Sequence, residues 1–233
     1  MANLDFFQKE ISNIHRQLID KLDRLVVGLS ALSDTELIQI AKQIDFFKEM
    51  QLLGYDRLIN KVGAAFDDEI AFVFSQLDEK QLGRISIASI DALNEVKLFE
   101  LDYLTSNAKQ YANQLKTAMM RGLITGETSP QIISGLSVGF GVGKYISSSE
   151  AIFLLGDAFT RFSRTSTAKA YLNFPKTKFT YDGPFDNKTR EACQRALKEG
   201  PLTQAQINGL GYIDFNNGGG WNCRHRWAKS FED

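Results

Sequence analysis

Apolar residues recur at helical spacing through most of the first 120 positions of the chain. Over residues 4–25 they follow steps of three and four residues, which places their side chains on one stripe of an α-helix. The same spacing predicts further helices over 33–54, 55–78 and 86–121, the first of them begun by SDTE, which has the form of a capping box. The residues of the first stripe are Leu4, Phe7, Ile11, Ile14, Leu18, Leu22 and Leu25.

Two interpretations of residues 1–122 follow from these helices. In the first, the helices pack as an antiparallel bundle, because marginal helices gain most of their stability from tertiary packing. In the second, they form an elongated helical hairpin whose apolar excess around Phe66 to Phe74 docks to an oligomer. Both interpretations predict a mainly α fold whose N-terminal part acts in assembly and docking.

Residues 123–174 are interpreted as linker helices joined by a glycine-rich loop. The sequence TSP at 128–130 is typical of a helix start, and SSS at 147–149 is expected to cap a longer helix. The intervening GLSVGFGVGK is not a phosphate-binding loop. That motif needs glycine five residues before its Gly-Lys pair and Ser or Thr after it, whereas this chain has Val138 and Tyr145. The stretch is therefore predicted to connect two helices.

The pattern changes to short elements between turns in residues 175–233. Aromatic and polar residues alternate over 179–181, which predicts a short strand. Asp186 or Asn187 is expected to cap a helix, and a capping box at 203–206 begins another. This stretch is therefore predicted to be a small α+β domain that follows the mainly α part. Elements this short bury little apolar area, so the domain is expected to need a further source of stability.

Composition and charge narrow the class of protein. Hydrophobic residues make up 43% and charged residues 24% of the chain, as in ordinary globular proteins, and no apolar run reaches the roughly 18 residues of a membrane span. The N-terminal residues do not read as a secretory signal, so synthesis in a cytoplasm is expected.

The charge is uneven along the chain. Residues 1–160 hold 15 Lys and Arg against 21 Asp and Glu, a net charge of −6, and residues 161–233 hold 12 against 7, a net charge of +5. The basic segment either lies against nucleic-acid phosphates or is ordinary surface variation.

Nearly all the metal-binding and nucleophilic chemistry falls in the C-terminal segment. One interpretation brings Cys193, Cys223 and His225 to a zinc ion, with Asp186 or Asp214 as a fourth ligand. In a second, both cysteines are small buried hydrophobes and the histidine makes a local hydrogen bond. A third makes Cys193 a nucleophile paired with His225. Two cysteines are too few for a disulfide framework.

The stretch GGGWNCRHRW is predicted to close over the small domain as a structural clasp. We define the clasp as residues 218–227, in which the glycines allow a sharp turn and Trp221 and Trp227 supply buried apolar area. Cys223 is expected to approach Cys193, with the histidine on the same face because an extended chain has a period of two residues.

The arginines of this region are expected to lie on the outside of the clasp. The two-residue period turns Arg224 and Arg226 away from the buried face, where they can pair with Asp186 or Asp214 or meet an external phosphate. Arg190 is a further candidate for such an ion pair or phosphate contact.

Three stretches carry a resemblance to a known family. They are MMRGLITGETSPQIISGL, then FSRTSTAKAYLNFPKTKFTYDGPFDNKTREACQRAL, and finally GGGWNCRHRW. Together they resemble the C-terminal domain of the phage minor head proteins, or head morphogenesis proteins, of the phage Mu type, over about residues 115–230. The residues that match the family's pattern are Arg164, Thr165, Phe179 to Tyr181, Asp186, Thr189, Arg190, Cys193, Asn222, Cys223 and Arg224.

The resemblance implies a structural virion protein that lies inside the head near the portal vertex and is needed for correct head assembly. Its expected partners are the portal or other head proteins, with packaged DNA as a further contact, in a ring-like or symmetric oligomer without a membrane. Delivery with the DNA is compatible with this position. The resemblance implies neither an enzymatic activity nor a cofactor.

Two alternatives remain from the residues themselves. One is an enzyme or toxin-like effector that uses Cys193 and His225, and the other is a zinc-stabilised binding module. The sequence shows no paired-carboxylate, Ser-His-Asp or phosphate-loop constellation, which favours the structural role over an enzyme.

Overall fold

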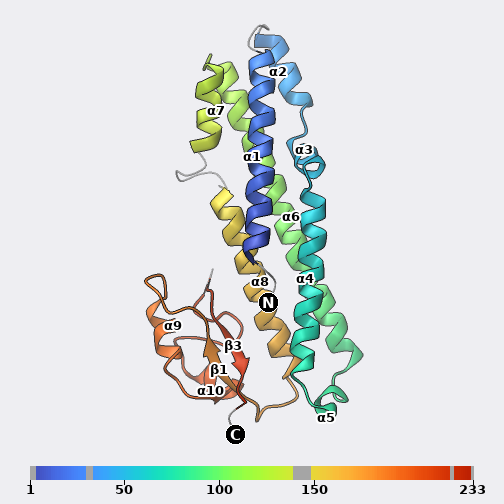
Figure 1. The fold of residues 1–233 in the computed structure, drawn as a ribbon, viewed down its shortest axis with the longest axis vertical. Helices are drawn as coiled ribbons and strands as arrows, with labels where there is room; N and C mark the ends of the chain where they lie inside the picture. Colours follow the sequence, from blue (N-terminus) through green and yellow to red (C-terminus); the bar gives the residue numbers. More distant parts are fainter. Residues whose placement is uncertain (1–3, 30–33, 139–147, 221–222, 232–233) are drawn as a thin grey trace. The chain divides into compact units, whose positions relative to one another are not determined.

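The computed structural model of the chain describes residues 4–29, 34–138, 148–220 and 223–231 (Figure 1). The chain is mainly α-helical and carries one small antiparallel sheet in its C-terminal part, which confirms the predicted fold class. The capping box at the start of the second predicted helix, most of the glycine-rich connection and the side chain of Trp221 lie outside the described residues.

Within those ranges, every helix is too short or too polar to span a membrane.

The first helix, α1 (Leu4–Leu29), follows the predicted stripe, and the apolar residues Phe7, Ile14, Leu18 and Leu22 on it are buried. A second helix over 33–54 was a wrong prediction, because the structure divides this stretch. It contains α2 (Asp34–Gln43) and α3 (Phe46–Leu52).

The break between α2 and α3 lies at Asp45, whose carboxylate accepts a hydrogen bond from the backbone N–H of Lys48 and caps a new helix. A side chain that satisfies a free N–H in this way favours a fresh helix start over continuation. At the other end, Gly54 follows α3 with a φ of 110°, a conformation that favours glycine.

Two long helices follow as predicted, namely α4 (Tyr55–Ser75) and α6 (Ile87–Ile124). Between them lies the short α5 (Glu79–Leu82), which begins with a capping box formed by Asp78 and Gln81. The next helices are α7 (Ser129–Val138) and α8 (Ser148–Ala170).

The chain packs as two compact units, each built from segments that are distant in the sequence. Unit 1 contains Val62–Leu101 and Leu154–Asp233, and unit 2 contains Asn3–Lys61 and Asp102–Phe153. These units group residues that pack together in space, whereas the three ranges expected from the sequence follow the chain. The three ranges therefore stay a prediction.

Unit 2 is a helical unit whose core comes from α1, α3 and the C-terminal half of α6. Leu18 and Leu115 are fully buried in it, and the phenol of Tyr55 donates a 3.0 Å hydrogen bond to the backbone oxygen of Leu104. His15 also contacts the hydroxyl of Tyr111, and burial lowers the pKa of this histidine.

In unit 1, the C-terminal half of α4 and the N-terminal half of α6 pack with α8. The rings of Phe66 and Phe162 stack with centroids 4.3 Å apart, and both side chains are fully buried. Arg161 on α8 binds the carboxylates of Glu100 on α6 and Asp157 on its own helix. Much of the apolar excess around Phe66 is therefore used inside unit 1, whereas Phe72 stays 48% exposed.

The α+β part of unit 1 is a three-stranded antiparallel sheet with two short helices. Strand β1 (Lys178–Asp182) lies in the middle and pairs with β2 (Leu202–Thr203) on one side and β3 (Arg226–Lys229) on the other. The helices are α9 (Glu191–Ala196) and α10 (Gln204–Gly209), the second begun by the predicted capping box.

A single apolar core joins this sheet to the ends of α4 and α8. Its buried members are Val73, Leu77, Ala170, Tyr171, Phe179, Tyr181, Cys193, Ala196, Ile207, Ile213, Phe215, Cys223 and Trp227. Since the core includes residues of α4 and α8, the small α+β part buries more apolar surface than its own short elements supply.

The helix that was expected to begin at Asp186 or Asn187 begins later. Helix α9 starts at Glu191, and its N-cap residue Arg190 makes no side-chain cap hydrogen bond. The carboxylate of Asp186 instead accepts hydrogen bonds from the N–H of Lys188 and the hydroxyl of Thr189, which hold the preceding turn. Aspartate stabilises turns by the same bonds that cap helices, so the sequence alone did not separate the two.

Candidate functional site

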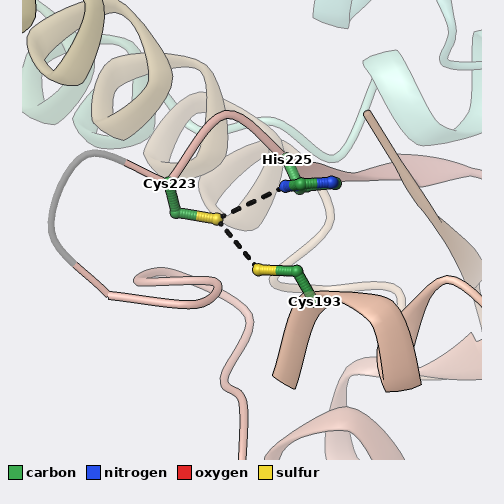
Figure 2. Close-up of side chains that lie close together, drawn as sticks. All are labelled: Cys193, Cys223 and His225. Atoms are coloured by element: carbon green, nitrogen blue, oxygen red, sulfur yellow. Dashed lines mark hydrogen bonds between the residues drawn. The ribbon is translucent and has the colours of Figure 1, made fainter. Parts of the chain in front are cut away.

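Cys193, Cys223 and His225 form a buried cluster in unit 1. The two sulfurs are 3.5 Å apart, and the sulfur of Cys223 lies 3.8 Å from Nδ1 of His225. One ligand atom from each residue lies within 4.8 Å of the other two. Figure 2 shows the three side chains pointing toward one another, with Cys193 on α9 and the other two on the segment that leads into β3.

The local chain conformation explains this meeting. Along 223–227, Cys223, His225 and Trp227 are buried and Arg224 is exposed, which is the two-residue alternation of an extended chain. On the other side, Cys193 and Ala196 form the buried positions of α9, three residues apart and thus on one face. The predicted approach of the two cysteines, with the histidine on the same face, is confirmed.

The imidazole of His225 is oriented by the backbone. Its Nε2 lies 2.8 Å from the carbonyl oxygen of Pro184, and a carbonyl can only accept, which assigns the ring proton to Nε2. Nδ1, which faces Cys223, then carries a free lone pair. The ring fits here because residue 183 is glycine, where a Cβ would lie 2.5 Å from the ring carbon Cδ2.

Two further groups contact the sulfurs. The hydroxyl of Tyr181 lies 3.4 Å from the sulfur of Cys223 and 3.6 Å from that of Cys193. The backbone N–H of Gly219 donates to the sulfur of Cys223 over 3.3 Å. A Cβ at position 219 would overlap the sulfur of Cys193, so only glycine leaves this space to the sulfurs.

These surroundings shift the pKa values of the two thiols in opposite directions. Burial raises the pKa of Cys223, but the hydrogen bonds from Tyr181 and from the backbone of His225 and Gly219, with the positive charge of Arg164, lower it to about 6. Burial raises the pKa of Cys193, which outweighs its hydrogen bond with the tyrosine. Burial and the two sulfurs also raise the pKa of Tyr181, so its hydroxyl keeps its proton. Cys223 is therefore the more acidic of the two thiols.

Arg164 on α8 holds the backbone that carries the cluster. Its guanidinium is buried and donates to the carbonyl oxygens of Asn217 at 2.9 Å, Cys223 at 2.7 Å and His225 at 2.6 Å. Among the described residues, no carboxylate forms an ion pair with it. The sequence alone assigned this residue no role beyond its place in the resemblance, because nothing local in the chain indicates acceptors more than fifty residues away.

The two carboxylates that were expected near the cluster lie elsewhere. Asp186 binds Arg224 through both oxygens, at 2.6 and 2.7 Å, which confirms one of the predicted ion pairs. Asp214 accepts from the N–H and the side-chain amide of Asn217, within a turn. Neither joins the cysteines and the histidine, so the prediction of a fourth, aspartate ligand was wrong for the residues that the structure describes.

The remaining arginines have partners that the sequence did not indicate. Arg226 contacts the carboxylate of Glu69 on α4 at 3.2 Å and the hydroxyl of Ser163 at 3.1 Å, which corrects its expected pairing with an aspartate of the small domain. Arg190 donates a 2.8 Å hydrogen bond to the carbonyl oxygen of Gly219. Both arginines thus help to hold the clasp in place.

Trp227 has the structural role that was expected of it. Its side chain is 1% exposed, its ring centroid is 4.6 Å from that of Tyr181, and its Nε1 donates to the carbonyl oxygen of Asp214 at 3.3 Å. The corresponding prediction for Trp221 concerns a residue outside the described ranges.

The ion pair of the clasp gives a prediction about pH. Its hydrogen bonds to Arg224 hold the pKa of Asp186 well below the usual range. Such a carboxylate stabilises the fold above its unfolded pKa of about 3.9, and the contribution is lost as the pH falls toward the folded pKa. Asp186→Asn should therefore lower the melting temperature slightly at about pH 7, and this difference should shrink below about pH 4.

Thermal melts of both proteins across this pH range provide the measurement. Asp182→Asn is a matched control, because Asp182 is also exposed, lies at the end of β1 four residues before Asp186, and forms no ion pair among the described residues. A pH-independent difference between Asp186→Asn and the natural chain would contradict the prediction.

The cluster is closed to solvent, since Cys193, Cys223 and His225 are 1%, 4% and 2% exposed. The histidine lies against Cys223 and not against Cys193, which differs from the nucleophile pair considered from the sequence. Comparisons of the chain with protein-family models, with curated proteins and with solved structures find no match.

Proposed function

We propose that this protein is a structural component of a tailed-phage particle, a minor head protein that acts in head morphogenesis near the portal. The observation that supports the proposal is that residues carrying the resemblance, though spread over sixty positions, contact one another. Arg164 binds the carbonyl oxygen of Cys223, and Cys223 meets Cys193. Asp186 binds Arg224 within the same cluster of contacts.

These contacts explain why such a pattern of residues would characterise a domain. Each of them closes a long loop in the chain, and together they fix the clasp on α8 and α9. Residues that hold a fold in this way suit a role in the architecture of a particle.

The partner of this protein in the proposal is the portal or another ring-forming head protein. Unit 1 leaves large apolar side chains of α6 exposed, among them Ile87 at 78% and Phe99 at 68%. Exposed apolar residues along one helix are available for contacts with another protein. Heterologous contacts of this kind close into rings when the rotation between subunits permits it. The basic charge of residues 161–233 suits an additional contact with packaged DNA.

Mass spectrometry of purified particles tests the proposal. The protein is expected in the heads, in few copies. A phage that encodes Arg164→Met should give few correctly assembled heads, because the domain loses its clasp. Lys198→Met, which removes an exposed positive charge from the same domain, should be incorporated normally. Particles of normal composition that lack the natural protein would contradict the proposal.

A second test addresses the partner. The full chain should co-sediment with purified portal, and it should do so without added DNA. If the chain stays in the supernatant when portal sediments, portal is not its partner. Incorporation into particles through another head protein would then identify that protein as the partner.

A further inference from the structure

We infer that Cys193, Cys223 and His225 bind a zinc ion that ties helix α9 to the segment before β3. This inference is independent of the proposed role in a phage head. It rests on the geometry of the three ligand atoms, on the orientation of the imidazole and on the groups around the sulfurs.

The distances between the ligand atoms fit a tetrahedral zinc ion. With Zn–S bonds of about 2.3 Å and a Zn–N bond of about 2.0–2.1 Å, tetrahedral angles place two sulfurs about 3.8 Å apart and a sulfur and a nitrogen about 3.6 Å apart. The observed distances are 3.5 Å between the sulfurs and 3.8 Å between Cys223 and Nδ1 of His225. The third edge of the triangle is at most 4.8 Å, so a small approach of Cys193 to His225 completes the set.

The histidine is prepared as a ligand. Metal-bound histidines usually donate their other ring N–H to a carboxylate or carbonyl, which fixes the tautomer and the plane of the ring. Nε2 of His225 makes this bond to the carbonyl oxygen of Pro184, and the free lone pair of Nδ1 faces the sulfurs. Nδ1 thus faces the sulfur of Cys223 with its lone pair, which is the orientation that a metal ligand needs.

The groups around the sulfur of Cys223 favour a thiolate, and Cys193 loses its proton on binding the ion. Hydrogen bonds from the N–H of Gly219 and the hydroxyl of Tyr181 reach the sulfur of Cys223, and the tyrosine reaches Cys193 as well. Two thiolates balance the double positive charge of the ion, and soft sulfur ligands with imidazole select zinc over the hard cations. The three residues leave the fourth position of a tetrahedral zinc ion to a water molecule.

The alternative chemistry of this cluster is a disulfide between the two cysteines. In the structure both are free thiols, with sulfurs 3.5 Å apart instead of the roughly 2.0 Å of a disulfide. A disulfide would leave the lone pair of His225 without a role and would consume both sulfur ligands. The two states exclude each other, and a single measurement of free thiols and bound metal distinguishes them.

The first experiment measures zinc in the full chain, purified without chelator under reducing conditions. Elemental analysis should find about one zinc ion per chain, and Co²⁺ in its place should give thiolate-to-metal charge-transfer absorption. Cys193→Ser and Cys223→Ser should each weaken zinc binding by at least about tenfold. Equal zinc content in the natural chain and both variants would overturn the inference, as would a metal-free chain that contains a Cys193–Cys223 disulfide.

The second experiment blocks the site without removing a ligand. Gly219→Ala places a Cβ on the sulfur of Cys193, whereas Gly200→Ala, in the same domain, meets no atom within 4 Å. Neither glycine has a positive φ, so the substitutions differ in space and not in backbone strain. Gly219→Ala should lose zinc and its charge-transfer signal, and Gly200→Ala should keep both. Full zinc binding by Gly219→Ala would overturn the inference.

A third measurement tests the inference on the natural chain, so that it does not depend on whether the variants fold. Adding chelator to the natural chain should lower its melting temperature, and adding Zn²⁺ back should restore it, because an ion that binds only the folded state stabilises that state. Chelator should leave the melting temperature of Cys223→Ser unchanged. A natural chain that melts identically with chelator and with added zinc would contradict the inference without any variant.

Discussion

Replacing Trp227 by alanine is expected to lower the free energy of unfolding by about 3–5 kcal/mol, the usual cost of truncating a buried tryptophan. The side chain is 1% exposed and belongs to the core that joins the sheet to α4 and α8. Its removal leaves a cavity beside Tyr181 and takes away the donor that binds the carbonyl oxygen of Asp214. Because domains are stable by only about 5–15 kcal/mol, the variant should melt far below the natural protein.

Chemical denaturation monitored by circular dichroism measures this change. Phe231→Ala is the matched control, since Phe231 is an aromatic residue close by in sequence that is 76% exposed and should lose little stability. Trp227→Phe should fall between the two, because it keeps most of the ring and loses the Nε1 donor. Equal stability of Trp227→Ala and Phe231→Ala would end the idea that the clasp depends on this tryptophan.

Replacing Arg164 by methionine is expected to cost about 3 kcal/mol or more. The substitution leaves the carbonyl oxygens of Asn217, Cys223 and His225 without their donor, and a buried polar group left unsatisfied costs about 1–3 kcal/mol. Methionine fills much of the volume of the arginine stem, so the loss reports hydrogen bonding more than packing. The backbone that carries two members of the cluster would also lose its anchor to α8.

Denaturation of Arg164→Met and of Lys198→Met separates this effect from a simple change of charge, since Lys198 is exposed. Arg164→Lys keeps the charge but lacks the planar fork that reaches several acceptors, so it should recover only part of the stability. Full recovery by lysine would mean that charge alone matters and that the three carbonyl contacts contribute little.

Much of the fold follows from the sequence because periodicity and capping are local signals. Phe7, Ile14, Leu18 and Leu22 of the first stripe are buried as the spacing predicts, and the capping box at Thr203 begins α10. The meeting of Cys193 and Cys223 was also predictable, because small buried side chains and the two-residue period of an extended segment leave few other arrangements.

What could not be predicted depends on contacts across the fold. Arg226 contacts Glu69, which lies 157 residues away in the sequence, and Ser163, which lies 63 residues away. Sequence patterns within one segment carry no information about such pairs. The predictions at Asp45 and Asp186 were wrong for another reason. An aspartate caps a helix or closes a turn with the same hydrogen bonds, and the choice is made by packing around it.

The position of the acceptors of Arg164 also sets an order of events during synthesis. Domains fold as their chains emerge from the ribosome, and contacts that close long loops form only when both ends are available. Helix α8 emerges with its arginine, but the carbonyl oxygens of Cys223 and His225 follow 59 and 61 residues later. Until then these contacts of the guanidinium cannot form, and Cys193 lacks the sulfur of Cys223 as a partner. The α+β part of unit 1 therefore cannot be completed before the segment that forms β3 arrives.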